Sequence, residues 1–333
     1  MKYVKYLLIS FVTLILLYFA GPSRPKPVLN HNLPAINGSV INYVANMENR
    51  PEVKIRPDCE ARIYWANDST HQPTEYVLLY LHGFSASWRE GFPINLDFAR
   101  YFGCNAFLAR LASHGVVTEN PLLEMTPDRL YESAKEALMV ARQLGKKVVI
   151  MACSTGCTLA LKLASDFPDM VHGMILYSPN VQIKQKSAVW LSGPWGLQIA
   201  RLVYKGDFVV TDYNPNGEYC KYWNCKYRCE AIVYLQQLLD ATMKKEIFEK
   251  ISCPVLMGYY YKDEQHQDQI VEVKAALKMM TELGISESNK RIVAFEKAGN
   301  HVIACDLTSG AVPDVRSQTF AFAKEVLGMK SNR

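Results

Sequence analysis

The chain is predicted to be an α/β protein with a doubly wound, mostly parallel sheet and an inserted helical cap. In its 333 residues, short apolar runs typical of buried strands alternate with segments of helical periodicity. Between residues 179 and 250 this alternation stops, and tryptophan and tyrosine residues accumulate. One apolar run ends at a serine that has small residues two positions before and after it, and a helical pattern follows. These observations favour a parallel sheet with a site at its strand ends, under the cap.

The apolar runs define the predicted strands of the sheet. They occupy residues 75–81, 105–111, 147–152, 173–178, 254–261 and 290–295, with a further early strand at 60–66. Helices are predicted at 93–103, 126–144 and 313–327. In the second of these, Thr126 caps the helix and Pro127 takes its first position. Strand–helix–strand units of this kind connect in a right-handed sense and give a parallel sheet.

The composition suits one large domain with an insertion. The chain is 49% hydrophobic and carries a net charge of +5, without a basic run with interleaved aromatics, so no nucleic-acid partner is predicted. We expect residues 1–21 to be a membrane anchor or signal peptide and 22–54 a linker and lead-in. Residues 55–178 and 251–333 are then the core, and 179–250 the cap insertion.

The amino terminus has the pattern of an export segment. Lys2 and Lys5 precede an apolar run at 7–21, which is shorter than the ~20 residues that a membrane-spanning helix needs. A cleaved signal peptide and an uncleaved anchor both fit, and the large residue at Tyr18 makes a poor cleavage site and favours the anchor. The rest of the chain would then lie outside the cytoplasm, membrane-anchored, or secreted or periplasmic if cleaved.

Residues 152–156 read Ala-Cys-Ser-Thr-Gly and stand between a strand and a helix. This is the arrangement of a nucleophile elbow, in which a tight turn exposes a reactive serine. Ser154 is therefore the candidate nucleophile, and Ala152 departs from the usual glycine but is still small. The alternative is that Ser154 only caps the helix.

The strand at 75–81 runs directly into His-Gly-Phe at 82–84. In an elbow enzyme, the loop after this strand supplies one backbone N–H of the oxyanion hole and the residue after the nucleophile supplies the other. Phe84 and Thr155 are the predicted donors. The alternative is an ordinary turn in which His82 forms structural hydrogen bonds.

A histidine and an acid follow the last two strands. His301 lies in the loop after 290–295 and is the candidate general base. After the strand at 254–261, Asp268 and Asp263 are both candidate acids for orienting it. Asp268 is preferred because the residues after it lead into the next helix, whereas Asp263 lies at the usual distance from the strand. The order serine, acid, histidine is typical of such sites.

Nine cysteines cannot all pair within one chain. Cys220, Cys225 and Cys229 cluster inside the predicted cap. In an exported protein this favours one disulfide that pins the cap, with free thiols or a metal site as alternatives. No histidine lies near them, and their spacing does not match common zinc patterns.

Together these motifs resemble the α/β-hydrolase superfamily, most closely the capped carboxylesterase and monoacylglycerol-lipase-like group. The resemblance covers roughly residues 55–328, and its motifs lie at 80–87, 109–115, 152–156, 263–273 and 298–302. It implies a serine hydrolase that cleaves small acyl esters through an acyl-enzyme, with no metal or organic cofactor. A peptidase, thioesterase or acyltransferase with the same triad is the alternative, as is a non-catalytic binding protein. The sequence gives no indication of oligomeric state.

Overall fold

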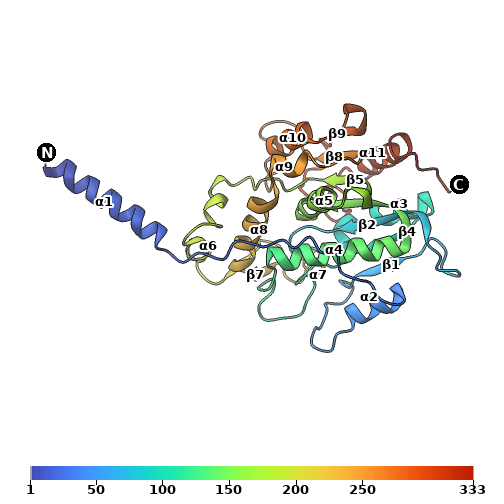
Figure 1. The fold of residues 1–333 in the computed structure, drawn as a ribbon, viewed down its shortest axis with the longest axis horizontal. Coiled ribbons are helices and arrows are strands. Elements are labelled where there is room, and N and C mark those ends of the chain that lie inside the picture. Colours follow the sequence, from blue (N-terminus) through green and yellow to red (C-terminus); the bar gives the residue numbers. More distant parts are fainter. Residues whose placement is uncertain (1, 333) are drawn as a thin grey trace.

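A single seven-stranded sheet organises the computed structural model, which describes residues 2–332 (Figure 1). The strand order is β1-β3-β2-β4-β5-β8-β9. β1 pairs antiparallel with β3, and every other neighbouring pair is parallel. The strands are β1 (Arg62–Tyr64), β2 (Thr74–Leu81), β3 (Asn105–Leu108), β4 (Gly145–Cys153), β5 (Val171–Tyr177), β8 (Val255–Tyr259) and β9 (Lys290–Ala294). The predicted fold class, a doubly wound and mostly parallel α/β sheet, is confirmed.

Helices cover both faces of the sheet, so the central strands are apolar on both sides. In β2, Leu79 packs with helices α4 (Pro127–Leu144) and α5 (Thr155–Asp166), whereas Tyr80 packs with α3 (Ile94–Phe102) and α11 (Val312–Glu325). Further helices of the structure are the short η1 (Trp88–Gly91), η2 (Pro168–Met170) and η4 (Glu287–Asn289), and α10 (Val273–Glu282). Because these strands run parallel, the carboxyl ends of β4, β8 and β9 lie at the same edge of the sheet.

Residues 179–250, which we call the cap segment, lie between β5 and β8. They form η3 (Lys186–Trp190), α6 (Gly196–Val203), α7 (Glu218–Tyr222), α8 (Cys229–Thr242) and α9 (Lys245–Phe248), with a small antiparallel sheet of β6 (Phe208–Val210) and β7 (Lys226–Arg228). The division of the chain into core and cap stays a prediction. A disulfide joins Cys220 to Cys225, and Cys229 is a buried free thiol, so the expectation of one disulfide in this segment is confirmed.

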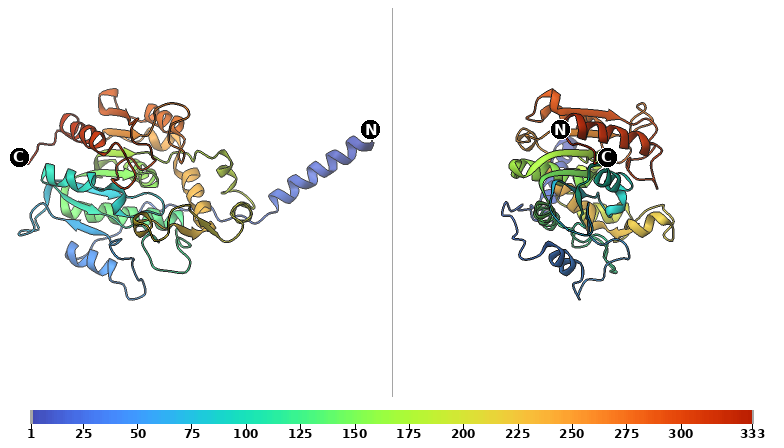
Figure 2. Two further views of the ribbon diagram at one scale, coloured as in Figure 1. Left: turned by 180° about the vertical axis from the view of Figure 1, so that it is seen from behind. Right: turned by 90° about the vertical axis from the view of Figure 1, so that its right-hand side faces the viewer.

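The amino-terminal helix α1 (Lys2–Phe19) extends away from the body (Figure 1). The two chain ends lie at opposite ends of the long axis, also when the molecule is seen from behind (Figure 2). Within residues 2–332, no helix combines the length and hydropathy that crossing a membrane requires. The membrane anchor or signal peptide expected at residues 1–21 stays a prediction.

The stretch predicted as a linker packs on the body instead of standing free. The side-chain amide of Gln237 in α8 donates to the Pro25 carbonyl at 3.0 Å. The ammonium group of Lys135 in α4 is fully buried and donates to the carbonyls of Asn30, at 2.8 Å, and Asn32. Helix α2 (Val40–Glu48) follows within the predicted lead-in. The polar composition of this stretch suggested a solvated chain, but its backbone carbonyls help to satisfy a buried cation that also pairs with Glu132 at 2.8 Å.

Candidate active site

Ser154 lies in the turn between β4 and α5 with φ 52° and ψ −117°. Residues other than glycine rarely adopt a positive φ, and such strained positions are concentrated at functional sites. The turn also needs the glycine two residues later. A Cβ placed on Gly156 would lie 2.1 Å from the carbonyl oxygen of Leu81, which no structure tolerates. The sequence motif thus folds as the tight turn that its small residues predict.

His301 and Asp268 are brought together by the loops after β9 and β8. His301 Nδ1 lies 2.6 Å from Asp268 Oδ2. The other oxygen of this carboxylate accepts the amides of Ile270, at 2.8 Å, and Val271, at 3.1 Å. Asp268 is completely buried, so these three hydrogen bonds, and not water, stabilise its negative charge.

The alternative acid, Asp263, lies elsewhere. Its side chain is 49% exposed, and its carboxylate contacts His266 Nδ1 at 2.8 Å. An antiparallel bridge between Tyr261 and Gln267 closes the intervening residues into a small loop. The chain therefore returns to the end of β8 at Asp268, whose amide donates to the Tyr260 carbonyl at 3.1 Å.

The two partners shift each other's pKa in opposite directions. Burial lowers the pKa of the His301 imidazole, but the Asp268 carboxylate and, less strongly, Glu90 raise it, and the net shift is upward. Burial raises the pKa of the Asp268 carboxyl, but His301 and the amides of Ile270 and Val271 lower it, and the net shift is downward. The arrangement thus favours an ionised carboxylate and a basic imidazole.

A cavity of about 410 Å³ lies beside the candidate nucleophile and the candidate base. Ser154 and His301 both line it, together with Phe84 and several aromatic residues of the cap segment. Within the described residues no hydrogen bond joins the Ser154 hydroxyl to the imidazole. In substrate-free sites such bonds are often long and tighten only in the substrate complex.

Two backbone amides in the segments around Ser154 have no acceptor inside the described part of the chain. They belong to Phe84, in the loop after β2, and to Thr155, the first residue of α5. The first amides of a helix point out of its N-terminus and attract negative charge. The predicted oxyanion donors are therefore both free to bind an oxygen atom.

His82 and His114 have structural hydrogen bonds. The Leu111 amide donates to His82 Nε2 at 3.0 Å, and the Ser85 amide donates to His114 Nε2 at 3.0 Å. Burial lowers the pKa of His114 to about 4, so this ring is neutral and can accept. The two rings fix the loop that carries Phe84, in line with the structural alternative considered for His82.

The wall of the cavity also includes the disulfide-closed loop of the cap segment. Trp223 lies inside this loop and lines the cavity. The amide of Asn224 donates to the Ser85 carbonyl at 2.8 Å, and Arg56 donates to the Asn224 side chain at 2.7 Å. The loop is thus attached both to Arg56, at the start of the predicted core, and to the segment that carries Phe84.

Sequence reasoning missed Glu90. This residue of η1 is 2% exposed and lines the cavity, and its Oε2 accepts the Gly83 amide at 2.5 Å. Burial raises the pKa of its carboxyl to about 7, although the Gly83 amide and His301 limit the increase. In the sequence it is one acidic residue in Trp-Arg-Glu, a pattern that does not separate it from a solvated surface charge.

Comparisons with known proteins place this geometry in a fold class. No family model matches the sequence. Similar curated proteins include Protein ABHD8 of Bos taurus, 27% identical over 149 residues, and Protein ABHD8 of Homo sapiens, 28% identical over 131 residues. These matches cover 44% and 38% of this chain. They cover 32% and 28% of the relatives, so the chain matches only about a third of their length.

Solved structures with a similar fold include lipolytic enzymes. One, from work on the metagenome-derived lipolytic enzymes LipS and LipT, has a TM-score of 0.64 at 17% identity and covers 81% of this chain and 98% of its own. The monoacylglycerol lipase of Paleococcus ferrophilus has a TM-score of 0.53 at 12% identity, with 80% and 99% covered. A monoglyceride lipase variant of Saccharomyces cerevisiae has a TM-score of 0.53 at 14% identity, with 89% and 97% covered. The chain has the α/β-hydrolase fold, as its sequence resemblance predicts.

Proposed function

We propose that the protein is a serine hydrolase that cleaves carboxylic esters through an acyl-enzyme. Ser154 is the nucleophile, His301 the general base, and Asp268 the acid that orients it. The observation that carries this proposal is the 2.6 Å contact between His301 and Asp268 at a cavity that Ser154 also lines. The lipolytic enzymes among the similar structures support a hydrolase activity.

The chemistry follows from these positions. The Ser154 hydroxyl attacks the ester carbonyl carbon while Nε2 of His301 takes its proton, because Nδ1 is engaged by Asp268. The tetrahedral oxyanion accepts hydrogen bonds from the amides of Phe84 and Thr155. Collapse of this intermediate expels the alcohol, which receives the proton from His301. A water molecule then releases the acid by the same steps in reverse.

The substrate is proposed to be a small or medium acyl ester. The cavity volume of about 410 Å³ and its aromatic wall suit an acyl group of that size. Peptidase, thioesterase and acyltransferase activities use the same triad, and a panel of ester, thioester and aminoacyl-amide substrates separates them.

Fluorophosphonate labelling of the full chain tests the proposal. A fluorophosphonate reacts only with an activated serine, so we expect wild type to be labelled and Ser154→Ala not to be. Asp268→Asn should lose most of the labelling rate, whereas Asp263→Asn, its matched control in the same loop, should keep it. A folded wild-type chain that stays unlabelled, or labelling that persists in Ser154→Ala, would contradict the mechanism.

A further inference from the structure

The carboxylate of Glu90 lies beside the nucleophile. A Cβ placed on Gly83 would lie 2.9 Å from Glu90 Oε1 and 3.0 Å from the Cβ of Ser154. Both groups therefore flank the same short piece of backbone. Oε2 accepts the Gly83 amide, and the Cys153 thiol and the Trp223 indole also contribute hydrogen bonds that limit the rise in the pKa of this carboxyl. Since Glu90 lines the cavity, its carboxylate borders the space that a ligand would occupy.

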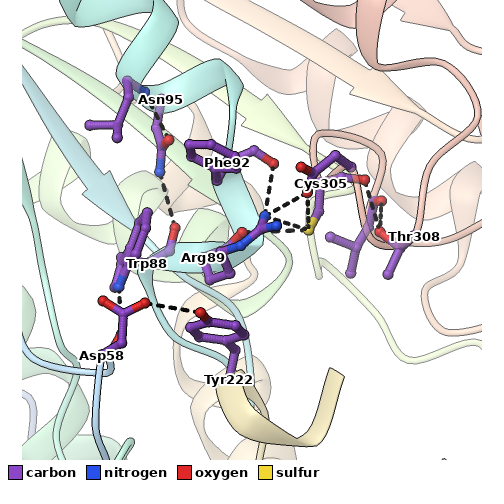
Figure 3. Close-up of polar contacts among 11 residues, drawn as sticks. Asp58, Trp88, Arg89, Phe92, Asn95, Tyr222, Cys305 and Thr308 are labelled. Carbon is purple, nitrogen blue, oxygen red and sulfur yellow. Dashed lines mark hydrogen bonds and ion pairs between the residues drawn. The ribbon is translucent and has the colours of Figure 1, made fainter. Parts of the chain in front are cut away.

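Trp88 and Arg89, the two residues of η1 that precede Glu90, are held by polar contacts (Figure 3). Asn95 donates to the Trp88 carbonyl at 3.0 Å, and the Trp88 indole donates to the Asp58 carbonyl at 2.7 Å. On the other side, Arg89 donates to Asp306 at 2.6 Å, and the Cys305 thiol donates to the Arg89 carbonyl at 3.4 Å. These contacts anchor the residues before Glu90 to three separate segments, so its carboxylate is preorganised rather than mobile.

No basic side chain neutralises Glu90. Within the described part of the chain it forms no ion pair, and besides the imidazole of His301 it is the one cavity-lining side chain with a formal charge. The rest of the lining is uncharged, and its rings are those of Phe84, Tyr213, Tyr219, Trp223, Tyr227 and Tyr260. Aromatic faces and a carboxylate both attract cations, and neither attracts an anion.

An uncompensated carboxylate at this place opposes the reaction of a neutral ester. The transition state carries negative charge on the carbonyl oxygen, close to Ser154, and a nearby anion disfavours it. A positive charge on the substrate would remove this opposition and would pair with the Glu90 carboxylate at the cavity wall. We propose that the cavity selects esters that carry an ammonium group close to the scissile carbonyl, with Glu90 as the residue that recognises it. This inference rests on the proposed ester hydrolysis and deepens it.

Two isosteric esters test the selection. The p-nitrophenyl esters of trimethylammonioacetate and of 3,3-dimethylbutyrate differ only in a quaternary nitrogen in place of a carbon. The ratio of their kcat/KM values is compared among wild type, Glu90→Gln and the control Glu264→Gln, which removes an exposed carboxylate outside the cavity. Measurements at about pH 8.5 keep Glu90, with its pKa of about 7, ionised.

We expect Glu90→Gln to lower the ratio of kcat/KM for the cationic ester to kcat/KM for the neutral ester by about 10- to 100-fold, which corresponds to the loss of one charged hydrogen bond. Glu264→Gln should leave the ratio as in wild type. The amide oxygen of glutamine can still accept the Gly83 amide, so a purely structural Glu90 would change both esters equally. An unchanged ratio in Glu90→Gln would overturn the inference.

Binding without turnover separates this inference from the proposed function. In Ser154→Ala, tetramethylammonium should quench the fluorescence of Trp223, and Ser154→Ala with Glu90→Gln should bind it at least about tenfold more weakly. In wild type, tetramethylammonium should inhibit hydrolysis competitively, and neutral tert-butanol should not, which keeps a readout if Glu90→Gln fails to fold. Cation binding without ester turnover would refute only the hydrolase proposal. Ester turnover without cation binding would refute only the role of Glu90.

Discussion

The imidazole of His301 and the carboxylate of Asp268 face each other with 2.6 Å between Nδ1 and Oδ2. The carboxylate cannot turn away, because its second oxygen holds the amides of Ile270 and Val271. A buried acid that is fixed on both oxygens sets the tautomer and the orientation of the ring. The neighbouring Asp263 has no such partner in the site and instead contacts His266 at the surface.

Replacing the fixed acid should therefore cost most of the activity. We expect Asp268→Asn to lower kcat by about 10⁴-fold, because an amide favours the wrong imidazole tautomer. Asp263→Asn, which alters the same loop, should keep kcat within about twofold of wild type, as surface changes usually do. Initial rates on a p-nitrophenyl ester measure both. A larger loss in Asp263→Asn than in Asp268→Asn would assign the acid differently.

Activity should depend on pH through His301, which acts as a base only when neutral. Because Asp268 and Glu90 raise the pKa of His301 above its ordinary 6.5, kcat/KM should rise with pH and level off above that raised value. Removing the charge in Glu90→Gln takes away one of the groups that raise this pKa. The midpoint of the rise should then move to lower pH in a kcat/KM profile for a neutral ester. A midpoint that moves to higher pH would contradict the assignment.

The elbow glycine should be intolerant of even one methyl group. In Gly156→Ala the new Cβ would meet the backbone oxygen of Leu81, so the strand or the helix must shift. We expect a loss of roughly 1–3 kcal/mol or more in the free energy of unfolding. Gly206→Ala is the matched control, because nothing lies within 4 Å of its added Cβ. Denaturant unfolding compares the two, and equal stabilities would show that the turn relaxes freely.

The amino-terminal stretch should be coupled energetically to Lys135. In the full chain, Lys135→Met leaves the carbonyls of Asn30 and Asn32 without their donor and should cost roughly 1–3 kcal/mol of unfolding free energy. In a chain that lacks residues 1–34 those carbonyls are absent, so the same substitution should cost less. Denaturant unfolding of the four chains forms a double-mutant cycle. Additive effects would show that the contact contributes nothing.

The parts of the fold and site that sequence could predict are local ones. The strand of β4, the turn at Ser154 and the glycine after it occupy consecutive positions, and each restricts the next. His301 could be placed after a strand end for the same reason. The sequence could favour Asp268 over Asp263 but left both open, because the choice depends on the bridge between Tyr261 and Gln267 that closes off the extra residues of the loop.

Features that depend on contacts between residues far apart in the chain could not be predicted from the sequence. The environment of Glu90 is made by Gly83, seven positions away, and by His301, which is far along the chain. The packing of the amino-terminal stretch likewise depends on the burial of Lys135 in another element. In both cases the residue type alone does not distinguish a buried charge from a solvated one. Only the three-dimensional arrangement shows what surrounds it.

The loop closed by Cys220 and Cys225 also limits how the cavity can be redesigned. Its span is fixed covalently, and it is attached at Asn224 to both Arg56 and Ser85. Lengthening the loop would pull on the segment that carries Phe84, whereas exchanging the ring of Trp223 would alter only the wall. An engineer who wants a new substrate range should therefore vary side chains around the cavity and leave the length of this loop untouched.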